Sequence, residues 1–306
     1  MYKRLSLAAT AAFRFYSSSP VTTLSTTSHL PLLKQLQQQP LRRLDPIFSR
    51  PYIKTRTTMA FPTPTVASSE VLSKAATSHD STYKVLYFGI HGRAEIIRNL
   101  LGYGDAKWEE LPIDWPAQKT KTPFQCVPVV FETTADGTIL ELAEAQAIER
   151  YLAKKYHLMG KNAWEEHKVN EFFTSTDGAM LAFHSSVLRG PNGPIENQVE
   201  GANKFYAEVL AKFVALHEAY LAKNGSNGHY VGHQTTLADI KTSTFIDRLL
   251  LLHPTGAHEV GISKDKTPNL WKVRETVHAH PSFKKWIDSA RYKELDVSTR
   301  KMFIQA

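Results

Sequence analysis

The sequence predicts a small α/β domain followed by an all-helical domain, both preceded by a long leader. Strand patterns rich in aromatic and β-branched residues occur only within residues 83–160, where they alternate with helical patterns. Residues 161–306 show helical spacing and no convincing strand. The first 58 residues contain a single acid, Asp45, and differ from both in composition. These observations divide the chain into a leader at 1–58, a linker at 59–82, and the two domains.

The α/β domain begins with a strand and a helix and ends with a hairpin and a helix. Its first strand reads Tyr-Lys-Val-Leu-Tyr-Phe, and apolar residues then recur at helical spacing. Asp136-Gly137 marks a tight turn between the last two strands. The predicted strands lie at residues 83–88, 107–113, 127–131 and from 139, with helices at 93–103 and 143–156 and a short one after the second strand.

Four helical segments follow, separated by loops rich in Gly, Pro and Asn. Thr236 and Asp239 match a capping box, in which a hydroxyl residue and an acid three positions later satisfy backbone N–H groups. The run behind them is apolar enough to be the buried central helix of the domain. The predicted helices span residues 163–188, 195–222, 236–252 and 268–289.

The charges are distributed unevenly along the chain. A net charge of +8 would suit a nucleic-acid ligand. However, residues 1–58 hold 9 of the 37 Lys and Arg and 1 of the 29 Asp and Glu, so residues 59–306 carry 28 of each. The folded part is neutral, and we expect no nucleic-acid partner. No apolar run reaches the roughly 18 residues that a membrane span needs. The single Cys126 excludes an intramolecular disulfide and a cysteine-based zinc site.

The leader has the composition of a mitochondrial presequence. Its first 16 residues fit an amphipathic helix that carries arginine and lacks acids. Arg14 interrupts the apolar stretch, which is too weak for a secretory signal. We therefore expect mitochondrial import rather than a tail without a targeting role. Initiation at Met59 would instead give a cytosolic form, in which the Ser- and Thr-rich residues 59–82 serve as a linker.

Five segments in the correct order resemble the glutathione transferases, most closely the tyrosine-type enzymes of the sigma class. They include the first strand with its helix, an Asp-Trp-Pro segment, and a Val-Pro-Val segment. The five lie at residues 83–98, 113–119, 122–129, 147–152 and 236–240. The resemblance covers about two-thirds of the chain. It implies a thioredoxin-like glutathione-binding domain, an all-helical C-terminal domain and a homodimer, with glutathione as co-substrate and no cofactor.

The resemblance assigns the catalytic role to Tyr87. The thiol of glutathione has a pKa near that of free cysteine, about 8.5, so little thiolate exists at neutral pH. A hydroxyl donor stabilises the thiolate more than the thiol. The alternative is that Tyr87 only packs in the core, on the strand face that it shares with Val85. Arg93, at the start of the first helix, is implied to lie near the thiol and the glutathione backbone, or else is a solvated surface arginine.

The remaining glutathione contacts follow from the same resemblance. Trp115 and Lys119 match positions that hold the glycyl carboxylate. Val127 matches the residue whose backbone pairs with the cysteinyl part of glutathione like an added strand. This pairing requires a cis peptide at Pro128, which the sequence alone would not predict, because trans is the more stable form.

Several positions depart from the family pattern. Glu144 and Ala145 stand where Gln-Ser usually begins the third helix and binds the γ-glutamyl group. Ala145 lacks the hydroxyl, so we expect about five- to thirtyfold weaker glutathione binding. Cys126 replaces a glutamine at the glycyl end. Asp177 lies one residue before the position of an aspartate that reaches the partner subunit's glutathione, and is a candidate for that contact.

The leading hypothesis is a dimeric glutathione transferase that adds glutathione to electrophilic small molecules. One alternative is an isomerase or a redox protein, the latter acting through Cys126. Another is a glutathione-binding protein without turnover, which Ala145 supports. The second substrate is expected near Ile90, His91, Leu181, His184 and the tail after residue 291. We expect no metal site, because His278 and His280 do not face one another on a helix.

Overall fold

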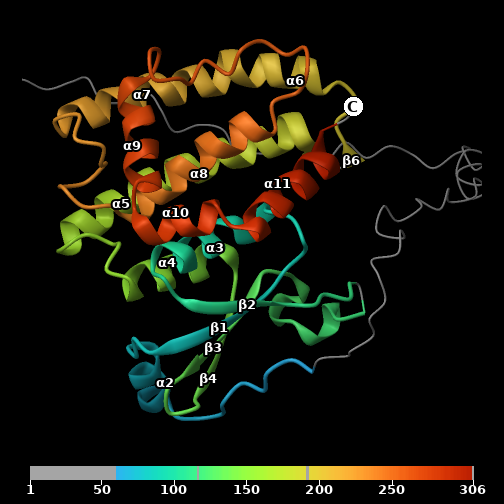
Figure 1. The fold of residues 1–306 in the computed structure, drawn as a ribbon, viewed down its shortest axis with the longest axis vertical. Coiled ribbons are helices and arrows are strands. Elements are labelled where there is room, and N and C mark those ends of the chain that lie inside the picture. Colours follow the sequence, from blue (N-terminus) through green and yellow to red (C-terminus); the bar gives the residue numbers. More distant parts are fainter. Residues whose placement is uncertain (1–59, 116, 191–192, 305–306) are drawn as a thin grey trace, which may run out of the picture. The chain divides into compact units, whose positions relative to one another are not determined.

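The computed structural model describes residues 60–115, 117–190 and 193–304, which belong to one compact unit. The leader and its expected presequence helix lie outside the described residues. An α/β domain comes first and a helical domain follows (Figure 1). The elements of the α/β domain are α2 (Ser69–Ala76), β1 (Ser81–Leu86), α3 (Glu95–Tyr103), β2 (Lys107–Leu111), β3 (Val129–Thr134), β4 (Ile139–Ala143) and α4 (Ala145–Lys155), with 3-10 turns at Gly92–Ala94, Lys119–Lys121 and Pro123–Gln125.

The four strands form one mixed sheet in the order β2-β1-β3-β4. β1 runs parallel to β2 and antiparallel to β3, and β3 pairs with β4 as a hairpin. Gly137 occupies the hairpin turn with φ of 83°, a conformation that glycine adopts without strain. The predicted fold class and the order of strands and helices along the chain from β1 to α4 are therefore confirmed.

The two faces of the sheet pack against different parts of the chain. Tyr83 and Val85 of β1 face α3 and α4 and join the main core. Alternate residues, such as Leu86 and Phe131, form a smaller cluster on the other face. Because Tyr87 follows Val85 by two positions, it lies on the same side of the sheet and packs against the main core.

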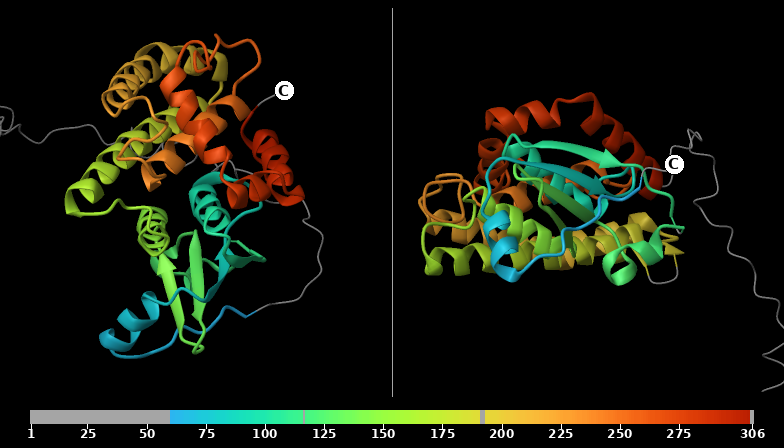
Figure 2. Two further views of the ribbon diagram at one scale, coloured as in Figure 1. Left: turned by 60° about the vertical axis from the view of Figure 1, so that its left-hand side comes forward. Right: turned by 90° about the horizontal axis from the view of Figure 1, so that it is seen from below.

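The helical domain is built around one buried helix, α8, which packs against α5 and α9 (Figures 1 and 2). Asp239 accepts a hydrogen bond from the Thr236 backbone N–H (2.7 Å), so the predicted capping box is confirmed. α3 and α4 of the α/β domain pack on α8, which joins the two domains. The helices are α5 (Ala163–Phe183), α6 (Gln198–Phe205), α7 (Ala211–Lys223), α8 (Leu237–Leu251), α9 (Pro268–His278), α10 (Pro281–Ile287) and α11 (Ala290–Phe303), with π-helical turns at His184–Leu188 and Tyr206–Leu210.

The residues expected to form a linker contain ordered structure. Ser68 caps α2, and the Thr65 backbone N–H donates to the Ile139 carbonyl of edge strand β4 (2.9 Å). Phe61 packs on the outer face of the sheet, near Phe131. The expectation of an unstructured linker was therefore wrong for these residues. Polar composition predicted a loop, whereas packing against the sheet and a hydroxyl cap decide the local structure.

The C-terminal part also differs from the sequence prediction. The helix expected at 268–289 is divided into α9 and α10, because Pro281 cannot continue the helix before it. The tail after Arg291 forms α11, whose start is capped by Ser289. A two-strand pairing, β5 (Arg189–Gly190) with β6 (Gly193–Pro194), lies where only a loop was expected. In the described part of the chain, no helix is long and apolar enough to cross a membrane.

Candidate active site

A cavity of about 510 Å³ lies between the α/β domain and the helical domain. One wall comes from the loop after β1 and the start of α4, and the other from helices α5, α8 and α11. Of the residues predicted to bind glutathione, Tyr87, Arg93, Val127, Ala145 and Asp177 line this cavity. The structure therefore brings together side chains that are up to 90 residues apart in the sequence.

The Tyr87 hydroxyl is held by the main chain beneath it. The Arg93 backbone N–H donates to the hydroxyl oxygen at 2.9 Å. This leaves the hydroxyl proton available to a second group, because a hydroxyl can accept and donate at once. Burial raises the pKa of Tyr87, and the Arg93 amide and the nearby Arg98 and Arg93 cations oppose that rise only in part. Tyr87 is therefore a neutral hydrogen-bond donor at physiological pH.

Gly92 allows the loop to pass close under the hydroxyl. Its φ is 46°, and a Cβ atom built there would lie 2.5 Å from the Tyr87 hydroxyl oxygen. Both the backbone conformation and the contact exclude a side chain. Arg93, the next residue, lines the cavity and its side chain is exposed.

Val127 and Pro128 lie where β3 begins, and the peptide bond between them is cis. This agrees with the implication of the family resemblance. Val127 lines the cavity, while Pro128 is buried behind it. The backbone of Val127 thus borders the space next to Tyr87.

The start of α4 forms part of the same wall of the cavity as the loop after β1. Ala145 is the first residue of the helix, so its backbone N–H belongs to the unsatisfied group at a helix N-terminus, which favours anions. Glu144 precedes it with φ of 67°, and its side chain lies near the thiol of Cys126, with Sγ and Oε1 3.6 Å apart. Neither Glu144 nor Cys126 lines the cavity.

Trp115 and Lys119 do not line the cavity either. The ring of Trp115 packs edge-on against Phe88, which does, with ring centroids 6.1 Å apart. Lys119 lies in an exposed 3-10 turn. The structure therefore places Trp115 one side chain away from the cavity and Lys119 at the surface.

Asp177 contacts two side chains of its own chain. One carboxylate oxygen lies 2.8 Å from the Lys241 ammonium, and the other accepts from the Gln146 amide at 2.6 Å. Lys241 also pairs with Glu149 of α4 at 2.9 Å and is 3% exposed. Burial raises the pKa of Glu149, and Lys241 opposes this rise. These four side chains line the cavity beside Ala145.

The far end of the cavity is largely apolar. Ile90, Leu181 and His184 line it as expected, but His91 lies buried behind the wall. Burial lowers the pKa of His184, as do the nearby Arg93 and Arg189 cations. The expected contribution of the C-terminal tail comes from Thr299 and Phe303 of α11.

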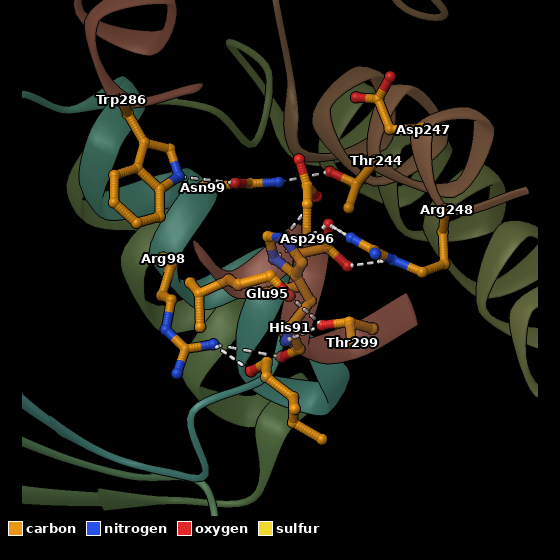
Figure 3. Close-up of polar contacts among 12 residues, drawn as sticks. His91, Glu95, Arg98, Asn99, Thr244, Asp247, Arg248, Trp286, Asp296 and Thr299 are labelled. Atoms are coloured by element: carbon orange, nitrogen blue, oxygen red, sulfur yellow. Dashed lines mark hydrogen bonds and ion pairs between the residues drawn. The ribbon is translucent and has the colours of Figure 1, made fainter. Parts of the chain in front are cut away.

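A second buried ion pair crosses between the walls. Glu95 of α3 accepts from the Arg248 Nε at 2.9 Å and also contacts its Nη2 (Figure 3). Sequence reasoning missed Lys241 and Arg248, although a signal was present. They stand seven residues apart, on one face of the helix that the sequence predicted to be buried, where an unpaired charge would be costly.

Metal ligands do not gather at this site or elsewhere in the described ranges, where no cluster of three or more His, Cys, Asp or Glu side chains is found. His278 Nε2 donates to the Asp247 carboxylate at 2.8 Å, and His280 stacks on Tyr103.

Comparison with known sequences places this geometry in context. The family profile described as "Glutathione S-transferase, C-terminal domain" matches residues 183–290. "Probable glutathione S-transferase 7" of Caenorhabditis elegans is 31% identical over 218 residues, which cover 68% of this chain and 96% of the relative. "Hematopoietic prostaglandin D synthase" of Mus musculus is 31% identical over 212 residues, covering 67% and 94%.

Solved structures show the same architecture. The rat structure described as "hPGDS complexed with a quinoline" has a TM-score of 0.54 at 28% identity, and covers 67% of this chain and 96% of that one. The Fasciola hepatica sigma class GST has a TM-score of 0.57 at 22% identity, covering 68% and 95%. At 22% identity, the similarity to the Fasciola hepatica structure supports the fold alone.

Proposed function

The chain belongs to the glutathione S-transferase family, and on that premise we propose that Tyr87 stabilises the thiolate of bound glutathione for transfer to an electrophilic small molecule. Glutathione S-transferase activity is supported by several relatives of that name at about 30% identity. The observation that carries the role of Tyr87 is its hydroxyl, which accepts from the Arg93 N–H and keeps its proton for a ligand.

The proposed role is quantitatively reasonable. Lowering a thiol pKa from about 8.5 by two units requires about 2.7 kcal/mol of differential stabilisation. One hydrogen bond to a charged group contributes about 1.5–3 kcal/mol. Arg93, which also lines the cavity, adds a cation near the same point. The thiolate then attacks the electrophilic carbon, and the electron pair leaves with the displaced group or moves into the acceptor.

The parts of glutathione fit four features around the cavity, three from the α/β domain and one, Asp177, from α5. The α-carboxylate of the γ-glutamyl group would meet the N-terminus of α4 at Ala145. Its ammonium would face the carboxylate of Asp177 in the same subunit. The cysteinyl backbone would pair with Val127, and the glycyl carboxylate would extend toward Trp115 and Lys119 at the surface. Glu144 would contribute through the main chain that begins α4.

Cys126 is a poor candidate for a redox role. Burial raises the pKa of its thiol, as do the charge and hydrogen bond of Glu144. A raised pKa reduces the thiolate fraction and so the nucleophilicity at neutral pH. Isomerisation stays an alternative, since a relative bears the name of a prostaglandin D synthase.

Two further proposals concern assembly and location. The resemblance supports a homodimer that acts in detoxification. Size-exclusion chromatography with light scattering measures whether the chain is a dimer. The composition of residues 1–58 supports mitochondrial import. A reporter fused to those residues should enter mitochondria, while a reporter fused to residues 59–306 should stay in the cytosol. Cytosolic retention of the first fusion would exclude the import proposal.

A conjugation assay on the full chain tests the proposed function. Glutathione and a generic aryl halide are supplied to the wild type and to Tyr87→Phe, Cys126→Ser and Tyr220→Phe. Tyr220 is an exposed tyrosine outside the cavity and controls for loss of a hydroxyl as such. We expect loss of turnover in Tyr87→Phe only. Loss in Cys126→Ser only would favour the redox reading, and an inactive wild type would favour binding without turnover.

A further inference from the structure

We propose that Thr299 of α11 is a positioning residue that holds the loop after β1, and through it the Tyr87 hydroxyl, in the geometry for thiolate stabilisation. The proposal rests on the proposed role of Tyr87. It assigns to the C-terminal helix a function beyond lining the cavity.

The loop after β1 is held from one side by Arg98 of α3. The guanidinium donates to the carbonyl oxygens of Phe88 (3.1 Å), Ile90 (2.9 Å) and His91 (3.2 Å). Its Nη2 also pairs with Glu110 at 2.7 Å. Arg98 therefore fixes the carbonyl groups of the loop but none of its N–H groups.

The helix α11 holds the loop from the other side, at His91 (Figure 3). The His91 backbone N–H donates to the Thr299 hydroxyl oxygen at 2.8 Å, and that hydroxyl donates to the Leu295 carbonyl at 2.6 Å. The His91 ring lies 2.8 Å from Asp296 and packs edge-on against Tyr292. Both His91 and Thr299 are buried, so water does not replace these contacts at little cost.

Only Gly92 separates His91 from the amide that binds Tyr87. The Arg93 N–H meets the Tyr87 hydroxyl oxygen at 2.9 Å, and Gly92 has no free space beneath that hydroxyl. A displacement of the His91 backbone therefore also displaces the Arg93 N–H, because a close-packed turn of two residues cannot absorb the movement. Loss of that N–H contact frees the hydroxyl to rotate away from a bound thiolate.

The start of α11 is tied to the same loop by a second route. The Arg291 Nε donates to Glu110 at 2.7 Å, and Glu110 in turn pairs with Arg98. Thr299 and Phe303, near the other end of the helix, line the cavity. The helix α11, which lines the cavity where the second substrate is expected, thus also fixes the loop that carries Tyr87, the proposed hydrogen-bond donor to the thiolate.

The first experiment compares Thr299→Val with Thr299→Ser and with Ser298→Ala in the full chain. Valine keeps the shape of threonine but cannot accept from the His91 N–H, whereas serine can. Ser298 is the exposed neighbour on the same helix. We expect Thr299→Val to lower kcat about tenfold and to raise the pH of half-maximal rate. The serine and Ser298 variants should behave as the wild type does.

The second experiment separates positioning from a general effect on the fold. If Thr299 acts through Tyr87, then Thr299→Val should lower kcat no further in a Tyr87→Phe background. Additive losses would overturn the proposal, as would a wild-type pH–rate profile in Thr299→Val. Should Thr299→Val fail to fold, Asp296→Ala carries the same test through the His91 ring.

The third measurement needs no glutathione. Amide hydrogen exchange at Arg93 should become about tenfold faster in Thr299→Val, because the Tyr87 contact that protects it is loosened. Unchanged exchange would overturn the proposal. An inactive wild type would refute the proposed function instead, and the exchange at Arg93 would still decide whether Thr299 fixes the loop.

Discussion

The two ends of the cavity are built in different ways. The wall from the α/β domain presents main-chain groups, such as the Arg93 N–H beneath Tyr87, the backbone of Val127 and the first N–H of α4. The far end presents side chains, including Leu181, His184 and Phe303, from helices distant in sequence. Contacts made by main-chain groups depend less on side-chain identity, whereas each substitution at the far end changes the surface that a ligand meets.

Buried ion pairs fix the two walls against one another. Glu149 and Glu95 come from the α/β domain, and their partners Lys241 and Arg248 come from α8. Removing one member would leave an uncompensated buried charge, which costs about 3–5 kcal/mol. These pairs therefore make the cavity shape depend on both domains, which matches the expectation that glutathione contacts the α/β wall and Asp177 of α5.

Gly92→Ala should give the largest effect on the main-chain end. The new Cβ would lie 2.5 Å from the Tyr87 hydroxyl oxygen, and the alanine would have to adopt a φ of 46°. We expect kcat to fall about a hundredfold, since removal of one transition-state donor costs about 2.7–4 kcal/mol in comparable sites. Steady-state kinetics with glutathione and a generic aryl halide gives the kcat of Gly92→Ala and of the wild type.

Gly137→Ala is the matched control for this change. It imposes alanine at φ of 83°, but nothing lies within 4 Å of the new Cβ. Equal losses in both variants would show that backbone strain, rather than displacement of Tyr87, lowers the rate.

A buried histidine of the helical domain should make the folded protein sensitive to acid. Burial lowers the pKa of His217 to about 4. Below pH 6.5 the unfolded state binds a proton that the folded state does not, so stability falls as the pH drops from 6.5 toward 4. The free energy of unfolding is measured with denaturant at pH 7 and pH 4.5. We expect the difference between the two values to be about 2 kcal/mol smaller in His217→Gln than in the wild type.

An exposed histidine controls for that measurement. His233→Gln, at an exposed position, should change the pH dependence of the free energy of unfolding far less than His217→Gln does. Asp239 titrates in the opposite sense, because burial raises its pKa to about 7, but its contribution cancels in the difference between variant and wild type. An unchanged slope in His217→Gln would show that another group governs acid unfolding.

Phe303→Ala should weaken only the side-chain end of the cavity. Loss of apolar contact should raise KM for an apolar electrophile about tenfold, while the Kd for glutathione stays within twofold. Steady-state kinetics gives the first value and calorimetry the second. Met302→Ala, at the exposed neighbour outside the cavity, should change neither. Equal changes in both constants would contradict the division of the cavity.

Ala145→Ser should give the smallest effect and touch only the main-chain end. A hydroxyl at the first residue of α4 adds one donor where the helix already favours an anion. We expect glutathione to bind about fivefold more tightly by calorimetry, corresponding to about 1 kcal/mol. Ala147→Ser, on the exposed side of the same helix, is the control. Weaker binding would mean that the γ-glutamyl group lies elsewhere.

Residues of continuous motifs were easier to place from the sequence than contacts between distant segments. Tyr87 and Val127 belong to short, continuous motifs whose residues are neighbours in the chain, so local pattern was enough to place them. The contacts of Asp177 depend on Lys241 and Gln146, which approach it only after α4, α5 and α8 have packed. No spacing rule connects such distant positions.

The missed helices have local physical causes. Residues 69–76 are polar enough to be read as a linker, yet Ser68 caps them and the Tyr151 hydroxyl reaches the Ala76 carbonyl at 3.4 Å. Lys155 also donates to that carbonyl at 3.4 Å. For α11, burial of Tyr292 and Leu295 on one face completes a helix that is otherwise rich in charge. In both cases tertiary packing outweighs composition.

The contact between Thr65 and β4 bears on which shortened forms of the protein would remain soluble. An open edge strand is a template for pairing with another chain, and natural proteins cover or interrupt such edges. Thr65 occupies that position by accepting from the Ile139 N–H (2.8 Å) and donating to its carbonyl (2.9 Å). A form that begins at Met59 keeps this cover. Proteolytic trimming beyond residue 68 would uncover β4 and favour aggregation through that edge, even though the cavity would keep every one of its lining residues.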